Sequence, residues 1–278
     1  MVHDACRSAA TDGAFTWRVS DEESVLILGL LASAATQAAP KFSWPDGRQA
    51  AIVLTYDDAI AASDLTVAAP QLDRAGLKGT FFLMGKAVRA EDVPRWRALA
   101  ASGHELGNHT VNHPCRRGTY DMPPQYHTES YSVGVLLTEI GAMNTLLTAL
   151  DGRPSHAFAV PCGHTVLGDG KDYIAPLKAS GLVSSIRDAP DLPAAPDGPP
   201  LLENGFVGSS GADMIAWVKQ VESSGGLGVV VFHGVGGDYL SVTAEAHQQL
   251  LDYLAAHRQT IWTATYSEAV SHAKRGAH

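Results

Sequence analysis

The chain has 278 residues, of which 45% are hydrophobic and 18% charged, and its formal net charge is −9. The length allows one large domain with a substantial core, and the composition is ordinary for a globular protein. The acidic balance and the lack of a basic stripe argue against a nucleic-acid partner, while leaving the substrate open.

The first forty residues are expected to lie outside the fold. Val25–Ala35 is a short apolar run followed by small residues up to Pro40, which resembles the apolar core and cleavage zone of a secretory signal. The run is too short to span a membrane. Residues 21–23 are acidic where a signal would be basic; a mis-set start near Val25 would explain this, and a disordered or helical extension is the alternative. We predict export to the periplasm or the medium, or a cytoplasmic protein if the segment is not a signal.

From residue 50 onward, apolar runs typical of strands alternate with amphipathic segments typical of helices. The expected strands are Ala50–Thr55, Gly79–Met84, His104–His109, His156–Val160, Leu182–Ile186, Gly228–Phe232 and Ile261–Thr265. The expected helices are Leu65–Ala75, Val93–Ala101, Glu129–Leu150, Asp172–Ser180, Ala212–Ser223, Thr243–His257 and Ser267–Ala273. The proline-rich stretch Asp188–Pro200 is expected to be a surface loop. This order predicts one α/β domain over residues 41–278, whose parallel strands close or nearly close into a barrel with helices outside.

Polar residues follow several of the expected strands. The first expected strand is followed by Asp57 and Asp58, in the segment Thr55-Tyr56-Asp57-Asp58. The third expected strand leads into the segment His109-Thr110-Val111-Asn112-His113-Pro114. In parallel barrels, functional groups gather at the carboxyl ends of the strands. Five residues come just after an expected strand and should therefore meet at one rim: Asp57, Asp58, His109, Pro161 and His233.

Two histidines and a carboxylate form the predicted metal site. His109 and His113 are four residues apart, so one turn would place both imidazoles on one side. With Asp58 as the third ligand, the set leaves coordination positions for water and a substrate oxygen, as in hydrolytic metal centres. Zinc is the default ion for these ligands, and cobalt, nickel or iron would also fit.

The remaining rim residues suggest acid–base chemistry. Adjacent residues on an extended segment point apart, so Asp57 is expected to be a general base and not a second ligand. A structural carboxylate or a helix cap is the alternative. His233 follows a buried strand, where a lone histidine is often structural. At a rim that carries a metal site, we expect it to protonate the leaving group.

Three cysteines are present, and Cys6 falls in the extension. If the protein is exported, a disulfide between Cys115 and Cys162 is expected near the metal site. Two free buried thiols are the alternative.

The motifs around Asp57–Asp58 and His109–Pro114, with the strand that leads to His233, resemble those of the polysaccharide deacetylase family, the NodB-homology carbohydrate esterases of the family 4 type. The resemblance covers about residues 48–270. It implies a distorted (β/α) barrel, usually seven-stranded, and metal-dependent removal of N- or O-linked acetyl groups from sugars. It also implies that Asp57 is the base, that His233 is the acid, and that the metal ligands are Asp58, His109 and His113.

One motif of the resemblance is altered. Where the family carries an arginine that orients the base, this chain has Ala159. Arg187, after the expected strand Leu182–Ile186, is the candidate substitute. The backbone N–H of Cys162, beside Pro161, would still serve as an oxyanion donor because that role needs no side chain.

Three functions are therefore compared. The first is a hydrolase that acts on an acetylated carbohydrate, with no nucleic-acid partner and no membrane span. The second is hydrolysis of a small non-sugar amide on the same fold. The third is a non-catalytic glycan-binding protein with a relic site, which the loss of the motif arginine would favour.

Overall fold

The computed structural model describes residues 42–194, 197–237 and 239–276, all of which belong to one compact unit that spans residues 39–278. The signal-like segment and the first forty residues lie outside the described residues. Export and the domain boundary at residue 40 therefore stay predictions.

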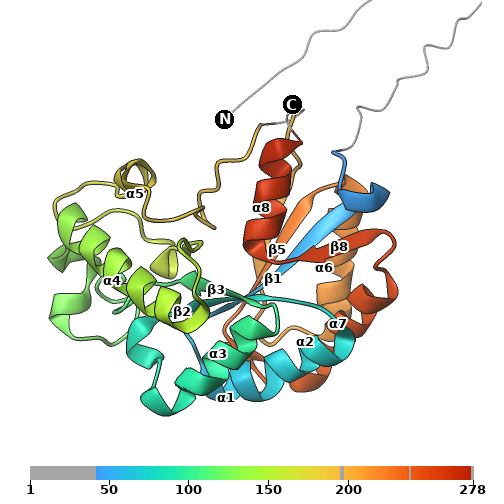
Figure 1. The fold of residues 1–278 in the computed structure, drawn as a ribbon, viewed down its shortest axis with the longest axis horizontal. Helices are drawn as coiled ribbons and strands as arrows, with labels where there is room; N and C mark the ends of the chain where they lie inside the picture. Colours follow the sequence, from blue (N-terminus) through green and yellow to red (C-terminus); the bar gives the residue numbers. More distant parts are fainter. Residues whose placement is uncertain (1–41, 195–196, 238, 277–278) are drawn as a thin grey trace, which may run out of the picture. The chain divides into compact units, whose positions relative to one another are not determined.

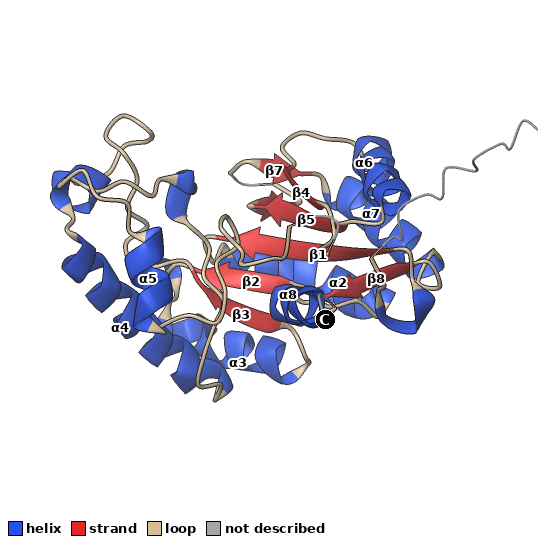
Figure 2. Ribbon diagram, turned by 90° about the horizontal axis from the view of Figure 1, so that it is seen from above, coloured by secondary structure: helices blue, strands red, loops and turns tan. Residues whose placement is uncertain are grey.

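Six parallel strands form the central sheet (Figure 2), in the order β3-β2-β1-β5-β4, with β8 also paired to β1. The strands are β1 (Ala50–Asp57), β2 (Thr80–Leu83), β3 (Glu105–Asn108), β4 (Leu201–Gly205), β5 (Leu227–Phe232) and β8 (Ile261–Ala264). One edge of β1 pairs with β5, and its other edge pairs with β8 near its start and with β2 at its end. β6 (Gly234–Val235) and β7 (Ser241–Val242) form a separate two-stranded pair. The chain thus places the carboxyl end of β1 between those of β2 and β5.

The helices surround this sheet (Figure 1), and α6 and α7 pack against each other. They are α1 (Ala61–Ser63), α2 (Ala69–Ala75), α3 (Val93–Ala101), α4 (Val133–Asp151), α5 (Ile174–Ser180), α6 (Gly211–Ser224), α7 (Ala244–Ala256) and α8 (Tyr266–Arg275). A π-helical segment, Asp64–Ala68, joins α1 to α2. The helix α4 starts later than predicted because the Ser132 hydroxyl caps it, accepting the N–H of Val135.

Helix α4 is also long and apolar enough to cross a membrane by length and composition, with a mean hydropathy of 1.5. Apolar residues along one side of the helix are nevertheless buried inside the protein: Leu136, Ile140, Met143, Leu147 and Leu150. A core helix passes the same test of length and composition, so this feature alone is weak support for a membrane span.

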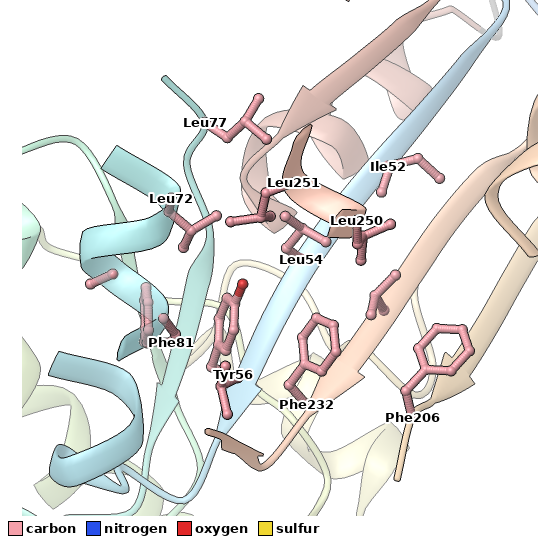
Figure 3. Close-up of a cluster of buried hydrophobic side chains, with 14 of the residues drawn as sticks. Ile52, Leu54, Tyr56, Leu72, Leu77, Phe81, Phe206, Phe232, Leu250 and Leu251 are labelled. Carbon is pink, nitrogen blue, oxygen red and sulfur yellow. The ribbon is translucent and has the colours of Figure 1, made fainter. Parts of the chain in front are cut away.

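Side-chain alternation along β1 separates two apolar clusters. Ile52, Leu54 and Tyr56 pack with residues from α2, α6 and α7 (Figure 3), whereas Ala51 and Val53 pack with residues from α8. Tyr56 stacks between two phenylalanine rings, with centroid distances of 4.7 Å to Phe81 and 5.4 Å to Phe232. This packing fixes the end of β1, from which Asp57 and Asp58 project.

The α/β class and the parallel strands are confirmed, whereas closure of the barrel is not shown. The predicted strands at 156–160 and 182–186 are reduced to single bridges, in which Phe158 pairs with Asn108 and with Ile186. Within the described ranges no pairing joins Ile186 to β4, so the seven-stranded barrel stays a prediction. The strand β4 was missed because its sequence, Leu-Leu-Glu-Asn-Gly, has three residues that are uncommon in strands.

Candidate metal centre and catalytic residues

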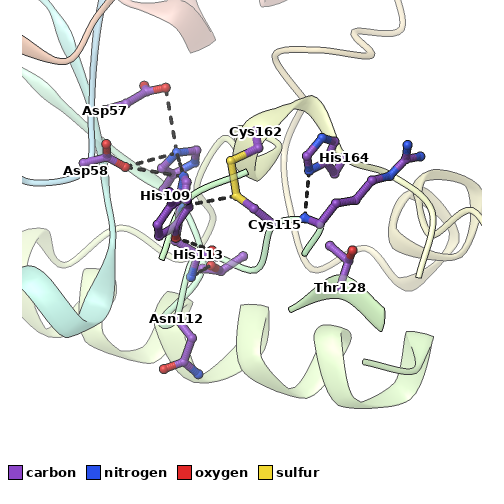
Figure 4. Close-up of a disulfide and its surroundings, with 12 residues drawn as sticks. Asp57, Asp58, His109, Asn112, His113, Cys115, Thr128, Cys162 and His164 are labelled. Atoms are coloured by element: carbon purple, nitrogen blue, oxygen red, sulfur yellow. Dashed lines mark hydrogen bonds and ion pairs between the residues drawn. A yellow bond between two sulfur atoms is a disulfide. The ribbon is translucent and has the colours of Figure 1, made fainter. Parts of the chain in front are cut away.

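The three predicted ligands lie together beyond the ends of β1 and β3 (Figure 4). The Nε2 atoms of His109 and His113 are 3.0 Å apart. Oδ1 of Asp58 lies 3.6 Å from the first of these atoms and 3.4 Å from the second. Each residue thus offers one ligand atom, and all three atoms lie within 4.8 Å of one another.

Hydrogen bonds at the far side of each ring define the tautomers. Nδ1 of His109 lies 3.0 Å from the carbonyl oxygen of Ala159, which can only accept, so this nitrogen carries the proton. Nδ1 of His113 lies 3.1 Å from the Tyr120 hydroxyl, which donates its own proton to the His113 carbonyl at 3.0 Å. Both Nε2 atoms therefore present lone pairs, as metal-binding histidines do when the other ring nitrogen is held by a partner.

The protonation states favour a cation at this point. Burial, together with nearby His109, lowers the pKa of His113 to about 2, so the imidazole is neutral at physiological pH. Burial raises the pKa of Asp58; His109 opposes the rise and Asp57 adds to it. Oδ1 of Asp58 is buried and has no hydrogen-bond partner among the described residues. The lone pairs of the two Nε2 atoms face each other beside an unpartnered carboxylate oxygen, and this arrangement costs free energy unless a positive ion lies between the three atoms. The three residues therefore fit a divalent metal ion.

The loop between the two histidines is held in an unusual backbone conformation. Thr110 and His113 have φ values of 62° and 56°, in the left-handed region that non-glycine residues rarely adopt. Oε1 of Glu139, on α4, accepts the backbone N–H groups of Val111 and Asn112 at 3.0 and 2.7 Å. Its Oε2 accepts the Tyr131 hydroxyl at 2.6 Å and the side-chain amide of Asn112 at 3.1 Å. Sequence reasoning missed Glu139, because nothing in a helical pattern marks a residue that binds a distant loop.

We expect Glu139→Gln to weaken metal binding by about 10- to 100-fold, since residues that orient ligands have effects of this size. The amide keeps the shape of the side chain but cannot accept all four hydrogen bonds. Competition with a chromogenic chelator would measure the affinity. Glu245→Gln, an exposed change on α7, is the matched control. Unchanged affinity in Glu139→Gln would contradict the positioning role.

Asp57 is paired with an arginine. Nη1 and Nη2 of Arg187 donate to its two carboxylate oxygens at 2.7 and 2.8 Å, and Nη1 also lies 3.2 Å from the Thr55 hydroxyl. Burial alone would raise the pKa of Asp57, but Arg187, His109 and His233 together lower it to about 2. Arg187 thus pairs with Asp57, the candidate base. This contact is the one expected of a substitute for the missing motif arginine.

The other predicted site residues lie around this pair. His233 is half-buried, its ring centroid is 6.1 Å from that of Tyr239, and its charge acts on both Asp57 and Asp58. Pro161 starts a short 3-10 turn in which Cys162 has a φ of 54°. Cys162 is joined to Cys115 by a disulfide, and Sγ of Cys115 lies 3.5 Å from Nδ1 of His113. The disulfide thus connects the histidine loop to the turn that carries the predicted oxyanion donor.

A cleft of about 1020 Å³ opens onto Asp58 and His113. Tyr120 and Tyr239 lie on its wall, together with residues that follow β1 and β2. The fold and this geometry define a class of protein: a parallel α/β protein with a three-ligand candidate metal site at the strand ends, beside an arginine-paired carboxylate.

Comparison with known proteins identifies the family. Residues 45–169 match the polysaccharide deacetylase family model, a range that contains Asp57, Asp58 and both histidines. Solved structures of this family's fold also superpose on the chain. The matched part of the chain, residues 45–169, belongs to the polysaccharide deacetylase family.

Individual relatives are distant. A gellan lyase from a Bacillus species is 30% identical over 132 residues, and the match covers 48% of this chain but only 5% of that protein. A Mycobacterium smegmatis protein described as a polysaccharide deacetylase is 18% identical, with a TM-score of 0.58 over 85% of this chain and 94% of that chain.

Two further structures show the range of proteins with this fold. A family 4 acetyl xylan esterase from Clostridium thermocellum, solved with a cobalt ion, is 16% identical, with a TM-score of 0.50 over 80% of this chain and 90% of that one. A Bacillus anthracis protein described as a family 4 pseudoenzyme is 15% identical, with a TM-score of 0.50 over 84% and 66% of the two chains. The fold alone therefore does not decide between enzyme and relic.

Proposed function

We propose that this protein is a metal-dependent hydrolase that removes N- or O-linked acetyl groups from a carbohydrate. One observation carries the proposal: two unprotonated imidazole nitrogens and Oδ1 of Asp58 converge beside a carboxylate that an arginine keeps ionised. The family supports the substrate class. The pairing of Arg187 with Asp57 argues against a relic site, because the loss of the motif arginine at Ala159 is compensated.

Asp58, His109 and His113 would hold the ion, which supplies Lewis acidity toward the acetyl carbonyl and toward a water molecule. Asp57, ionised at neutral pH, would accept a proton from the attacking water. His233 would donate a proton to the departing nitrogen or oxygen. The N–H of Cys162 would donate to the oxyanion that develops on the carbonyl oxygen.

Acetate release from acetylated glycans, together with ring opening of a cyclic amide, tests this proposal. The metal-stripped protein is reloaded with zinc or cobalt and assayed on O-acetylated xylan, N-acetylglucosamine oligomers and a small cyclic amide. We expect acetate from one or both glycans and none without metal. Turnover of the cyclic amide alone would favour the small-amide function, and glycan binding without acetate release under all metals would favour the non-catalytic one.

We also propose that the protein is exported. The disulfide between Cys115 and Cys162 supports this, since such bonds persist mainly in oxidising compartments. Fractionation of cells that express the full chain would test it, and a soluble cytoplasmic product would contradict it.

A further inference from the structure

The cleft is lined by apolar and aromatic residues and by several cations. Tyr239 is 58% exposed, and Tyr120, Ile60 and Met84 also line the cleft. Such surfaces suit the faces of sugar rings. The segment after β2 contributes the cations: Lys86, Arg89 and Arg95.

The charges in this segment are only partly compensated. Arg95 is paired with Asp92 at 3.2 Å. Lys86 donates to the carbonyl of Asn112 at 2.9 Å, beside His113, and no carboxylate lies within 4.0 Å of it in the described part of the chain. Arg89 is exposed, and within the same ranges its guanidinium has no hydrogen-bond or ion-pair partner.

The lining also carries three carboxylates against the three cations: Asp58, Glu91 and Asp92. Asp58 belongs to the candidate metal site, and Asp92 is used by Arg95. Among the described lining residues, Glu91 is then the one carboxylate without an ion-pair partner, whereas two cations, Lys86 and Arg89, have none. With Asp58 taken up by a bound metal ion, the lining keeps three cations against two carboxylates, an excess of one positive charge in a protein of net charge −9. That local charge would favour an anionic polymer, which the surrounding field would otherwise repel.

We propose that the cleft binds a carboxylate-bearing glycan, in which a uronate or a similar acidic sugar next to the acetylated residue contacts Arg89 and Lys86. The guanidinium of Arg89 matches a carboxylate in a bidentate geometry. Lys86 lies nearer the metal site, since its ammonium contacts the residue next to His113. The inference rests on the proposed function for its acetyl group, but the charge preference can be measured separately.

The test compares each polymer with its own uncharged form. An O-acetylated polygalacturonate and an alternating uronate–N-acetylglucosamine polymer are each assayed before and after methyl esterification of their carboxylates. We expect kcat/KM to be about two- to fivefold higher for the free acids, mainly through KM, a size typical of exposed charge pairs. The preference should shrink as salt is raised.

Three variants assign the preference to residues. Arg89→Gln should remove most of the difference in kcat/KM between acid and ester. Glu91→Gln should increase it, because the competing carboxylate is gone. Arg97→Gln carries the same charge change on α3, outside the cleft lining, where the guanidinium donates to the Ala149 carbonyl at 3.2 Å. This variant should match the unmodified protein.

Equal kcat/KM for acid and ester forms, or equal losses on both in Arg89→Gln, would overturn the inference while leaving deacetylation intact. If no polymer yields acetate, affinity electrophoresis of the metal-loaded protein with the same polymers tests whether the cleft binds the acid forms more tightly than the ester forms. Retardation by the acid forms that depends on Arg89 would support the acidic-glycan site without the enzyme. No difference between the two forms would overturn it.

Discussion

Asp57→Asn is expected to lower acetate release by about 10²- to 10⁴-fold, the range in which a positioned general base contributes. Asparagine has the same shape but cannot accept the proton of the attacking water. Metal binding should persist, because the candidate ligand atoms come from Asp58, His109 and His113. The assay is kcat with the best glycan of the panel, alongside metal content by mass spectrometry of the dialysed protein.

Asp58→Asn is the matched control for this experiment. It makes the same chemical change one residue away, but it removes the anionic ligand, so activity and metal content should fall together. Full activity of Asp57→Asn would refute the base assignment, and loss of metal in that variant would show that Asp57 is a ligand instead.

Arg187→Met is expected to have the second large effect, on both stability and activity. Arg187 is 4% exposed and donates to both oxygens of Asp57. Removing one partner of a buried ion pair leaves an uncompensated charge and costs roughly 3–5 kcal/mol. Urea unfolding at neutral pH would measure this loss of unfolding free energy.

The same variant should change the pH dependence of activity. Arg187 lowers the pKa of Asp57, so without it this pKa rises and the carboxylate becomes protonated at higher pH. Stability that comes from an Asp with a lowered pKa is present above its unfolded value, 3.8, and is lost as pH falls toward 2. We expect the acid limb of kcat/KM to move to higher pH in Arg187→Met.

Two further variants separate charge from shape. Arg187→Lys keeps the charge but cannot bind both oxygens, so its acid limb should lie between those of the unmodified protein and Arg187→Met. Arg153→Met removes an exposed arginine away from the site and should change neither measurement. An unshifted acid limb in Arg187→Met would show that the arginine is only structural.

Sequence patterns correctly predicted that Asp58 and His109 lie together, because each residue directly follows a buried strand. Their role as metal ligands stays a prediction. The end of β1 fixes Asp58, and the end of β3 fixes His109, so strand register alone brings them to one place. Identifying a role for Arg187 was harder. It follows a segment that pairs through a single bridge, and its partner lies 130 residues away in the chain.

Other contacts left no signal in the sequence. Glu139 and Tyr120 act on the histidine loop from α4 and from an irregular segment, through hydrogen bonds that depend on tertiary placement. The predicted strands at 156–160 and 182–186 have strand-like composition, but the observed pairing is limited to Phe158 and Ile186. Apolar composition predicts burial more reliably than it predicts a regular ladder of hydrogen bonds.

Titration of the metal-free protein with zinc, followed by acetate release at each point, tests the central claim most directly. We expect activity to rise with added zinc and to reach its plateau at one ion per chain, and we expect His113→Ala to show neither tight binding nor activity. Full acetate release by rigorously metal-free protein, or full activity of His113→Ala at one equivalent of zinc, would contradict it.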